Sequence, residues 1–210
     1  MPPEYEETAS YDQRSAFLEI HAQGRVAVAF GALLARMYLA LTESRGWETQ
    51  LIRPYPVQDS ETLDTLLYIS DPGAYGVLKY ESGLHQLCMP HAQGRRTARR
   101  CVAYVEMLPA PTEEEVALQD DDVRVDVLRH GGDRDLSNSS SDLVLRMTHL
   151  PTGTQMLCHK PKGTGWNSPC LLALWARLLN RHRAPGGKQT SVIRIYDLSI
   201  DGVIDTVSRR

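Results

Sequence analysis

Long apolar runs, cysteine and aromatic residues are all scarce in this sequence. No stretch reaches the roughly 20 consecutive apolar residues that a membrane-spanning helix needs, and no charged segment followed by an apolar one marks a secretory leader. Four cysteines in 210 residues are too few for a disulfide framework at this length. We therefore expect a cytoplasmic protein without a membrane segment, with one good core or two small ones.

One group of neighbouring histidines and cysteines contains His85, Cys88, His91 and Cys101. Zinc takes such ligands, but these residues do not form the Cys-x-x-Cys pairs of a zinc ribbon. We therefore expect no metal and no cofactor.

Basic residues are missing from the first 13 positions, although that segment contains four acidic residues. The net charge of the whole chain is only −3, so this segment is more negative than the chain as a whole. An acidic, proline-containing segment of this kind does not bury enough apolar surface to fold. We expect residues 1–13 to be a disordered acidic leader.

Basic residues instead gather in two later regions. One contains Arg95, Arg96, Arg99 and Arg100, and the other begins at Lys160 and Lys162 and continues through Arg177 in the C-terminal helix. The planar fork of arginine suits phosphate, so such groups are candidates for RNA contacts, although solvated charge is the commoner explanation. Few aromatic residues lie among them, which argues against binding single strands by base stacking.

The hydrophobic patterning predicts an α+β protein. Apolar residues recur at helical spacing over 26–45 at Phe30, Leu33, Leu34, Met37, Tyr38 and Leu41, and Gly46 marks the end of that helix. Ser168 and Pro169 suit the start of a second long helix. Strands are expected at 17–21, 48–53, 63–70, 84–88, 101–107, 122–128, 143–147, 154–158 and within 190–208, with a short helix at 73–80.

A polar loop interrupts the strands at residues 131–141. Before it, Val123, Val125 and Val127 alternate with charged residues, which predicts a strand with one buried face. After it, LPTG at 150–153 suits a tight turn between two strands. The loop contains two glycines and four serines, and its simplest interpretation is a solvated hairpin connection.

Six segments, in the same order along the chain, resemble segments of bacterial class I peptide chain release factors. FLEIHAQG at 17–24 resembles the family's LEIxAGxGG, and ARMYLALTESRGWETQLI at 35–52 resembles its RMYxxxAExRGWxxEI. The others are GAYGVLKYESGLHQL at 73–87, VRVDVLR at 123–129, LRMTHLPTG at 145–153 and IRIYDL at 193–198. Each segment alone is a weak signal, but their collinear order makes the resemblance strong from 16 to 208.

The resemblance implies two small α/β-sandwich-like units, similar to the codon-recognition and catalytic domains of these factors. The first unit would span 14–108 and be completed by 190–210, and the second would span 122–189. The residues 109–121, with two prolines and an acidic run, would link them. We expect no counterpart of the helical domain that begins full-length release factors.

The catalytic tripeptide of the family is missing from its expected place. Arg129 and Arg146 match the family's two flanking arginines without a change in length, so its Gly-Gly-Gln falls on Arg134, Asp135 and Leu136. In the family the glycines permit unusual backbone torsions and the glutamine is held against the ester bond of peptidyl-tRNA. A shifted substitute at Gly131, Gly132 and Asp133 stays open, although an acidic group would be repelled by tRNA phosphates.

The codon-reading loop of the family is also altered. At this place the family has Pro-x-Thr or Ser-Pro-Phe, whereas this chain has Pro90, His91 and Ala92 in a segment about three residues shorter. The family's basic Arg-Ser-Gln-His-Lys-Asn-Lys run is replaced by KGTGWNS at 162–168. Only Lys162 and Asn167 match its RNA-bracing chemistry.

The leading hypothesis is an RNA-binding or ribosome-binding homologue of release factors that neither reads stop codons nor hydrolyses peptidyl-tRNA. Its partner would be the ribosome or a structured RNA such as tRNA, and the chain is not expected to be an enzyme. One alternative is a repurposed enzyme acting on a tRNA ester through the rebuilt loop, with His130 and Asp135 as the reacting groups. Another is a ribosome-rescue factor.

Overall fold

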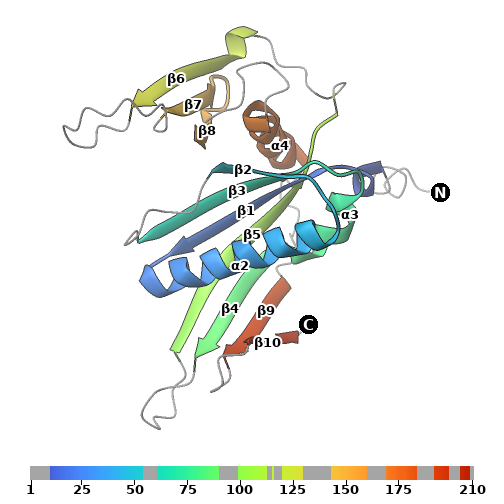
Figure 1. Cartoon of the computed structure of the whole chain (residues 1–210). Coiled ribbons are helices and arrows are strands. Elements are labelled where there is room, and N and C mark those ends of the chain that lie inside the picture. Colours follow the sequence, from blue (N-terminus) through green and yellow to red (C-terminus); the bar gives the residue numbers. More distant parts are fainter. Residues whose placement is uncertain are drawn as a thin grey trace.

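The computed structural model describes residues 10–53, 61–89, 99–112, 115, 120–129, 143–159, 169–183, 192–198 and 204–208. These residues form a seven-stranded sheet, a three-stranded sheet and the helices that pack on them (Figure 1). The α+β class expected from the sequence is confirmed.

The larger sheet has the strand order β10-β9-β4-β5-β1-β3-β2. Its strands are β1 (Ala16–Gln23), β2 (Thr49–Arg53), β3 (Thr62–Ile69), β4 (Gly83–Met89), β5 (Arg99–Pro109), β9 (Val192–Leu198) and β10 (Ile204–Ser208). The smaller sheet contains β6 (Val123–Arg129), β7 (Leu143–His149) and β8 (Thr154–His159). The helices are α2 (Arg25–Ser44), α3 (Ala74–Leu78) and α4 (Pro169–Arg183), with 3-10 turns at Lys79–Glu81 and Asp120–Asp122. The strands and helices expected between residues 17 and 158 are present, with ends within about two residues of those expected.

Strand β1 lies in the middle of the larger sheet and is buried on both faces. It pairs antiparallel with β3 on one side and with β5 on the other. Successive side chains of a strand point to opposite faces, so Leu18 and Ile20 enter the core under α2, while Phe17 enters a second core under α4. Glu19 and His21 share the face of Phe17. This strand therefore carries polar side chains into the space between the two layers.

Helix α2 packs on the sheet through Phe30, Leu34 and Tyr38, which are buried as expected. Leu33 and Met37 are about two fifths exposed, so the prediction that these two residues belong to the buried face of the helix is wrong. The helix is also long and apolar enough to cross a membrane by length and composition alone, a test that core helices pass as well. Its buried face is that of a core helix.

Helix α2 ends in a Schellman motif at Gly46, as the sequence predicted. Gly46 has a φ of 70°, a left-handed conformation that glycine adopts without strain. Its N–H donates to the carbonyl of Glu43, and the N–H of Trp47 donates to the carbonyl of Thr42. These two bonds satisfy carbonyls that the helix end leaves open.

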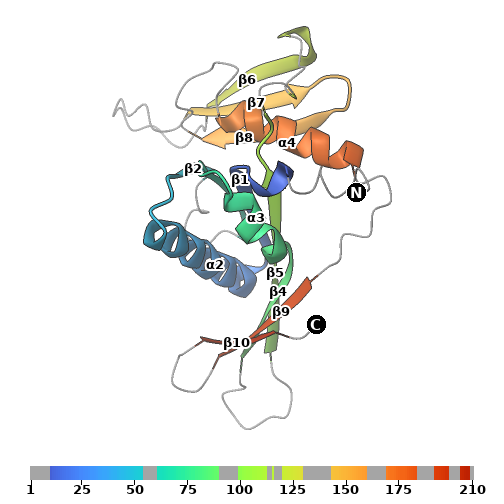
Figure 2. The same ribbon diagram turned by 90° about the vertical axis from the view of Figure 1, so that its right-hand side faces the viewer.

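Helix α4 lies between the two sheets (Figure 2). Its buried residues Leu171, Leu174 and Leu178 pack with Phe17 and Leu66 of the larger sheet. The same core includes residues of the smaller sheet, namely Leu145, Met147, Met156 and Cys158. One apolar core therefore joins the two sheets through α4.

Strand β6 does not have the buried valine face that the sequence predicted. Val125 is 49% exposed and Val127 is 59% exposed. The reason is that β6 is the edge strand of the smaller sheet and pairs only with β7, while α4 packs against β7 and β8. The alternation of valines and charged residues predicted the strand correctly. It did not predict which face of the strand another element covers.

Candidate functional site

The two loops that the sequence singled out connect hairpins at opposite ends of the molecule. Met89 and Arg99 form the last pair of the β4–β5 ladder, and Arg129 and Leu143 form the last pair of β6–β7. The paired ends of these hairpins lie far apart in both views (Figures 1 and 2). The strands thus hold the two loop positions on separate surfaces.

Most of the site residues predicted from the sequence lie outside the described residues. These are Pro90, His91, Ala92, Arg95, Arg96, His130, Gly131, Gly132, Asp133, Arg134, Asp135, Leu136, Lys160, Lys162 and Asn167. Arg99 is described only as part of β5, and Arg100 is exposed on the same strand. Their role in RNA binding stays a prediction.

From its position in the sequence we had expected Arg177 of α4 to be part of an exposed basic surface. It instead forms an ion pair with Glu19. Its Nε donates to Oε1 of Glu19 at 2.6 Å, and its Nη2 donates to Oε2 of the same carboxylate. Glu19 is 1% exposed and Arg177 is 22% exposed. The pair therefore bridges the central strand β1 and helix α4, with the carboxylate of Glu19 almost fully buried.

Histidine 21 extends this ion pair to a second acidic group. Its Nε2 lies 3.2 Å from Glu19 Oε2, and its Nδ1 lies 3.1 Å from Asp64 Oδ1. The hydrogen bonds with Asp64 and Glu19 raise the pKa of His21 to about 9. Asp64 also pairs with the buried Arg53, which donates to the carbonyl of Leu157 in β8.

Burial alone would raise the pKa of Glu19. Hydrogen bonds from His21 and Arg177, together with the charges of Arg177 and Arg53, outweigh burial and lower it. Glu19 is therefore ionised at neutral pH, and its charge is compensated by the groups around it.

Glu106 is the least compensated acidic group of this cluster. It lies on β5 directly opposite Glu19 in the β1–β5 ladder. Among the described residues its side chain has one hydrogen-bond partner, the Asn180 amide at 3.2 Å. Burial, and then the nearby charge of Glu19, raises the pKa of Glu106.

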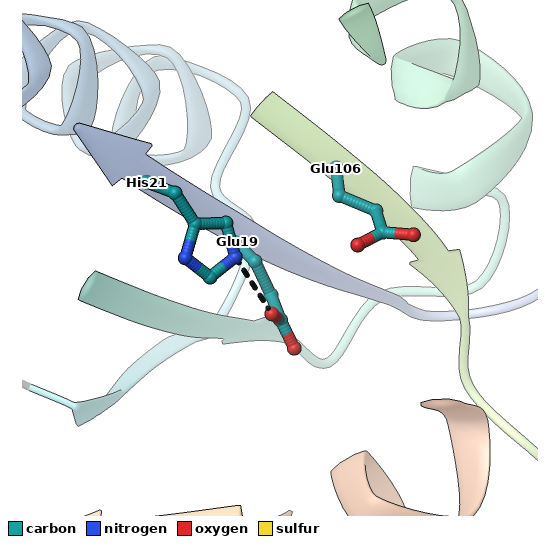
Figure 3. Close-up of side chains that lie close together, drawn as sticks. All are labelled: Glu19, His21 and Glu106. Carbon is teal, nitrogen blue, oxygen red and sulfur yellow. Dashed lines mark hydrogen bonds and ion pairs between the residues drawn. The ribbon is translucent and has the colours of Figure 1, made fainter. Parts of the chain in front are cut away.

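The cluster forms the floor of a pocket of about 500 Å³ between the larger sheet and the β7–β8 turn. Its lining residues are Glu19, His21, Glu106, Thr152, Gly153, Thr154, Gln155, Arg177 and Asn180. Gly153 has a φ of 68°, which confirms the predicted tight turn at LPTG. Figure 3 shows Glu19 and His21 on β1 beside Glu106 on β5.

Sequence reasoning missed this pocket. The alternation in FLEIHAQG places Glu19 and His21 on one face of a strand, and that signal could have suggested a polar face. The partners Asp64, Glu106 and Arg177 are distant in the sequence and come together only through strand pairing and the packing of α4.

His85, a residue of the possible zinc pattern, has both ring nitrogens engaged. Its Nε2 donates to the carbonyl of Glu81 at 2.9 Å, so Nδ1 accepts from the Tyr196 hydroxyl at 2.8 Å. Tyr196 lies on β9, which pairs parallel with β4. His85 is thus a buried neutral group that fixes β9 against β4.

Replacement of His85 should remove an acid-sensitive part of the protein's stability. Burial lowers the pKa of His85 from its ordinary 6.5, so below about pH 6.5 the unfolded chain gains a proton that the folded chain excludes. We expect the contribution of His85 to the free energy of unfolding to become less favourable as the pH decreases from 7.5 to 5.5, whereas the raised pKa of His21 gives a contribution of the opposite sign in that range. The difference in free energy of unfolding between the unmodified chain and His85→Gln should therefore shrink across this range, as measured by urea denaturation at several pH values.

Tyr196→Phe serves as the control, because it removes the hydroxyl contact and keeps the titrating imidazole. It should lower stability but retain the acid dependence of the unmodified chain. A constant difference between His85→Gln and the unmodified chain across this pH range would contradict the assignment.

Comparison with known proteins gives three related findings. Residues 6–96 match the PCRF domain. The chain is similar to peptide chain release factor 1 of Thermus thermophilus, with 34% identity over 80% of this chain and 49% of that protein. It is similar to peptide chain release factor 2 of Streptomyces avermitilis, with 33% identity over 84% of this chain and 49% of that protein.

The fold is similar to the solved structure of RF2 of Thermus thermophilus, with a TM-score of 0.69 and 24% identity. That likeness covers 97% of this chain and 69% of the other. By contrast, the chain spans about half the length of the curated relatives that it matches.

Proposed function

The chain is a homologue of the bacterial peptide chain release factors, and from this premise we propose that it binds the ribosome without reading stop codons or hydrolysing peptidyl-tRNA. The proposal is carried by a contrast within the chain. The hairpins that would present the two working loops are formed, whereas the residues that the family uses in those loops are replaced.

The β6–β7 hairpin supports the first part of this contrast. Its ladder is continuous from Val123 to Arg129, and the Arg146 guanidinium donates to Asp126 Oδ2 across the ladder at 2.9 Å. A loop that starts after Arg129 is therefore anchored on a regular ladder. Counted from Arg129 and Arg146, Leu136 falls at the position of the family's glutamine, and its side chain has no group that could orient water or stabilise an oxyanion.

The β4–β5 hairpin supports the second part. Its ladder runs without a register shift from Gly83 to Met89, so the segment 90–98 is held at its two ends by paired strands. Pro90, His91 and Ala92 replace the codon-reading tripeptide of the family. A shorter loop on the same strands reaches less far, which adds to the loss of the recognition side chains.

The binding partner in this proposal is ribosomal RNA or tRNA on the ribosome. Arg95, Arg96, Arg99 and Arg100 would contact phosphates beside the β4–β5 hairpin, and Lys160, Lys162 and Asn167 would do so near α4. A protein with this partner acts in the cytoplasm. The repurposed-enzyme and ribosome-rescue alternatives share the partner and differ in whether an ester is cleaved.

Co-sedimentation with purified ribosomes over a salt series tests the binding. We expect the full chain to pellet with ribosomes at low salt and to be released as salt increases, because phosphate contacts release counterions. Arg99→Ala/Arg100→Ala should weaken binding and make it less sensitive to salt. Each lost phosphate contact lowers the slope of log affinity against log salt by roughly 0.7–0.9.

Arg36→Ala/Arg45→Ala is the matched control, because both arginines are exposed on or beside α2 and neither belongs to the β4–β5 hairpin. It removes the same charge and should leave the slope unchanged. Failure of the unmodified chain to pellet at any salt concentration would overturn the proposal.

A further inference from the structure

We propose that Glu19, His21 and Glu106 form a binding site for a divalent transition-metal ion of the zinc class at the floor of the pocket. This site is separate from the ribosome-binding proposal and stands or falls independently of it. The three side chains each offer one ligand atom, and these atoms all lie within 4.8 Å of one another.

The donor set suits zinc rather than a hard cation. One imidazole nitrogen and two carboxylate oxygens are ligands that zinc accepts with bonds of about 2 Å, and three protein ligands leave a fourth position open. Magnesium and calcium would favour oxygen ligands alone. The pocket of about 500 Å³ above the cluster gives the ion an entry path and room for a water or another ligand at the fourth position.

Strand pairing places the ligands without a mobile loop. Glu19 and Glu106 are direct partners across the β1–β5 ladder, and His21 is two residues from Glu19 on the same face of β1. Like charges directly opposite each other destabilise a sheet. A cation bound between the two carboxylates would turn this repulsion into attraction.

Asp64 supplies the outer contact that metal-binding histidines commonly have. Its Oδ1 lies 3.1 Å from His21 Nδ1, so it fixes the ring and leaves Nε2 facing Glu19 and Glu106. A carboxylate that accepts from the distal nitrogen orients the ring and strengthens the other nitrogen as a ligand. Asp64 lies on β3, opposite His21 in the β1–β3 ladder.

The charges of the cluster also allow a dication. With His21 neutral, as metal binding requires, Arg53 and Arg177 leave one of the three carboxylates of Glu19, Asp64 and Glu106 without a compensating charge. Metal binding at Nε2 replaces the proton there, and an ionised carboxylate has about four lone-pair positions, so Glu19 can keep Arg177 while it binds the ion. Glu106, whose described partner is an amide, gains the compensating charge that it lacks.

The test is metal titration of the full chain after metal removal. Zn²⁺ binding would be measured by calorimetry, and Co²⁺ binding by its visible absorption, which reports the geometry and donors. We expect one site, lost or weakened at least about tenfold in His21→Gln and in Glu106→Gln. Asp64→Asn should weaken it by roughly 10-fold to 100-fold, because it acts through the ring of His21.

Glu43→Gln is the matched control, since Glu43 is an exposed acidic residue of α2. It should bind Zn²⁺ like the unmodified chain, and far-ultraviolet circular dichroism should show that every variant is folded. No binding by the unmodified chain, or equal affinity in Glu43→Gln, His21→Gln and Glu106→Gln, would overturn the proposal. In the second case the ion would be held by cysteines or histidines elsewhere.

Discussion

Arg177→Ala is expected to lower the free energy of unfolding by about 3–5 kcal/mol, as measured by urea denaturation at neutral pH. The substitution leaves the Glu19 carboxylate in a place with 1% exposure, without its bidentate partner. Removing one member of a buried ion pair is costly because the remaining charge stays buried without the partner that compensated it. A loss of this size is a large fraction of the free energy of unfolding of an ordinary domain.

A matched control comes from Arg124, which pairs with Asp126 but is 57% exposed. Arg124→Ala should change stability far less than Arg177→Ala, because water already screens that pair. If Arg177→Ala is too unstable to fold, Glu19→Gln/Arg177→Met provides the second measurement, because it removes both charges and should recover most of the loss. Equal free energies of unfolding for Arg177→Ala and Arg124→Ala would show that the buried pair contributes no more to stability than the exposed pair.

Peptide release from ribosomes is expected to stay at the background rate when this chain replaces a bacterial release factor. Enzymes typically accelerate their reactions by about a millionfold or more, so an active factor and this chain should differ by orders of magnitude. The reason is chemical, because Leu136 stands where the family's glutamine is expected. The measurement is release of labelled peptide from ribosomes with a stop codon in the A site, and separately with puromycin as a positive control for ester reactivity.

The release assay also separates the alternatives. Release at a rate comparable to that of a bacterial factor would exclude the non-hydrolytic proposal, and loss of that activity in His130→Ala or Asp135→Ala would favour the repurposed-enzyme interpretation. The co-sedimentation experiment shows whether the chain is on the ribosome during the assay. Without that control, a background rate could reflect absence of binding.

The sequence predicted most strands and helices because each has a clear periodicity and a clear terminator. Gly46 ends α2 and Gly153 completes the β7–β8 turn, and both adopt the left-handed conformations that such turns need. Periodicity did not predict which face of each strand or helix is covered by another element. Val125 and Val127 alternate like buried residues, but β6 is an edge strand, and Leu33 and Met37 extend an apolar stripe beyond the part that contacts the sheet.

The polar pocket was harder to predict than the elements that build it. Glu19 and Arg177 are 158 positions apart, and nothing in the sequence near Arg177 distinguishes it from the other basic residues of the same region. The same side chain supports phosphate binding if exposed and a structural ion pair if buried. Only the packing of α4 against β1 decides between the two.

The core shared by the two sheets has a consequence for how the sequence can vary. Phe17, near the start of the chain, packs in the same cluster as Leu174, near its end. Interiors are packed closely enough that a change of one side chain's volume is felt by its neighbours. Mutational drift in one half of the gene is therefore restrained by the other half, and acceptable replacements at such positions should arise as compensating pairs.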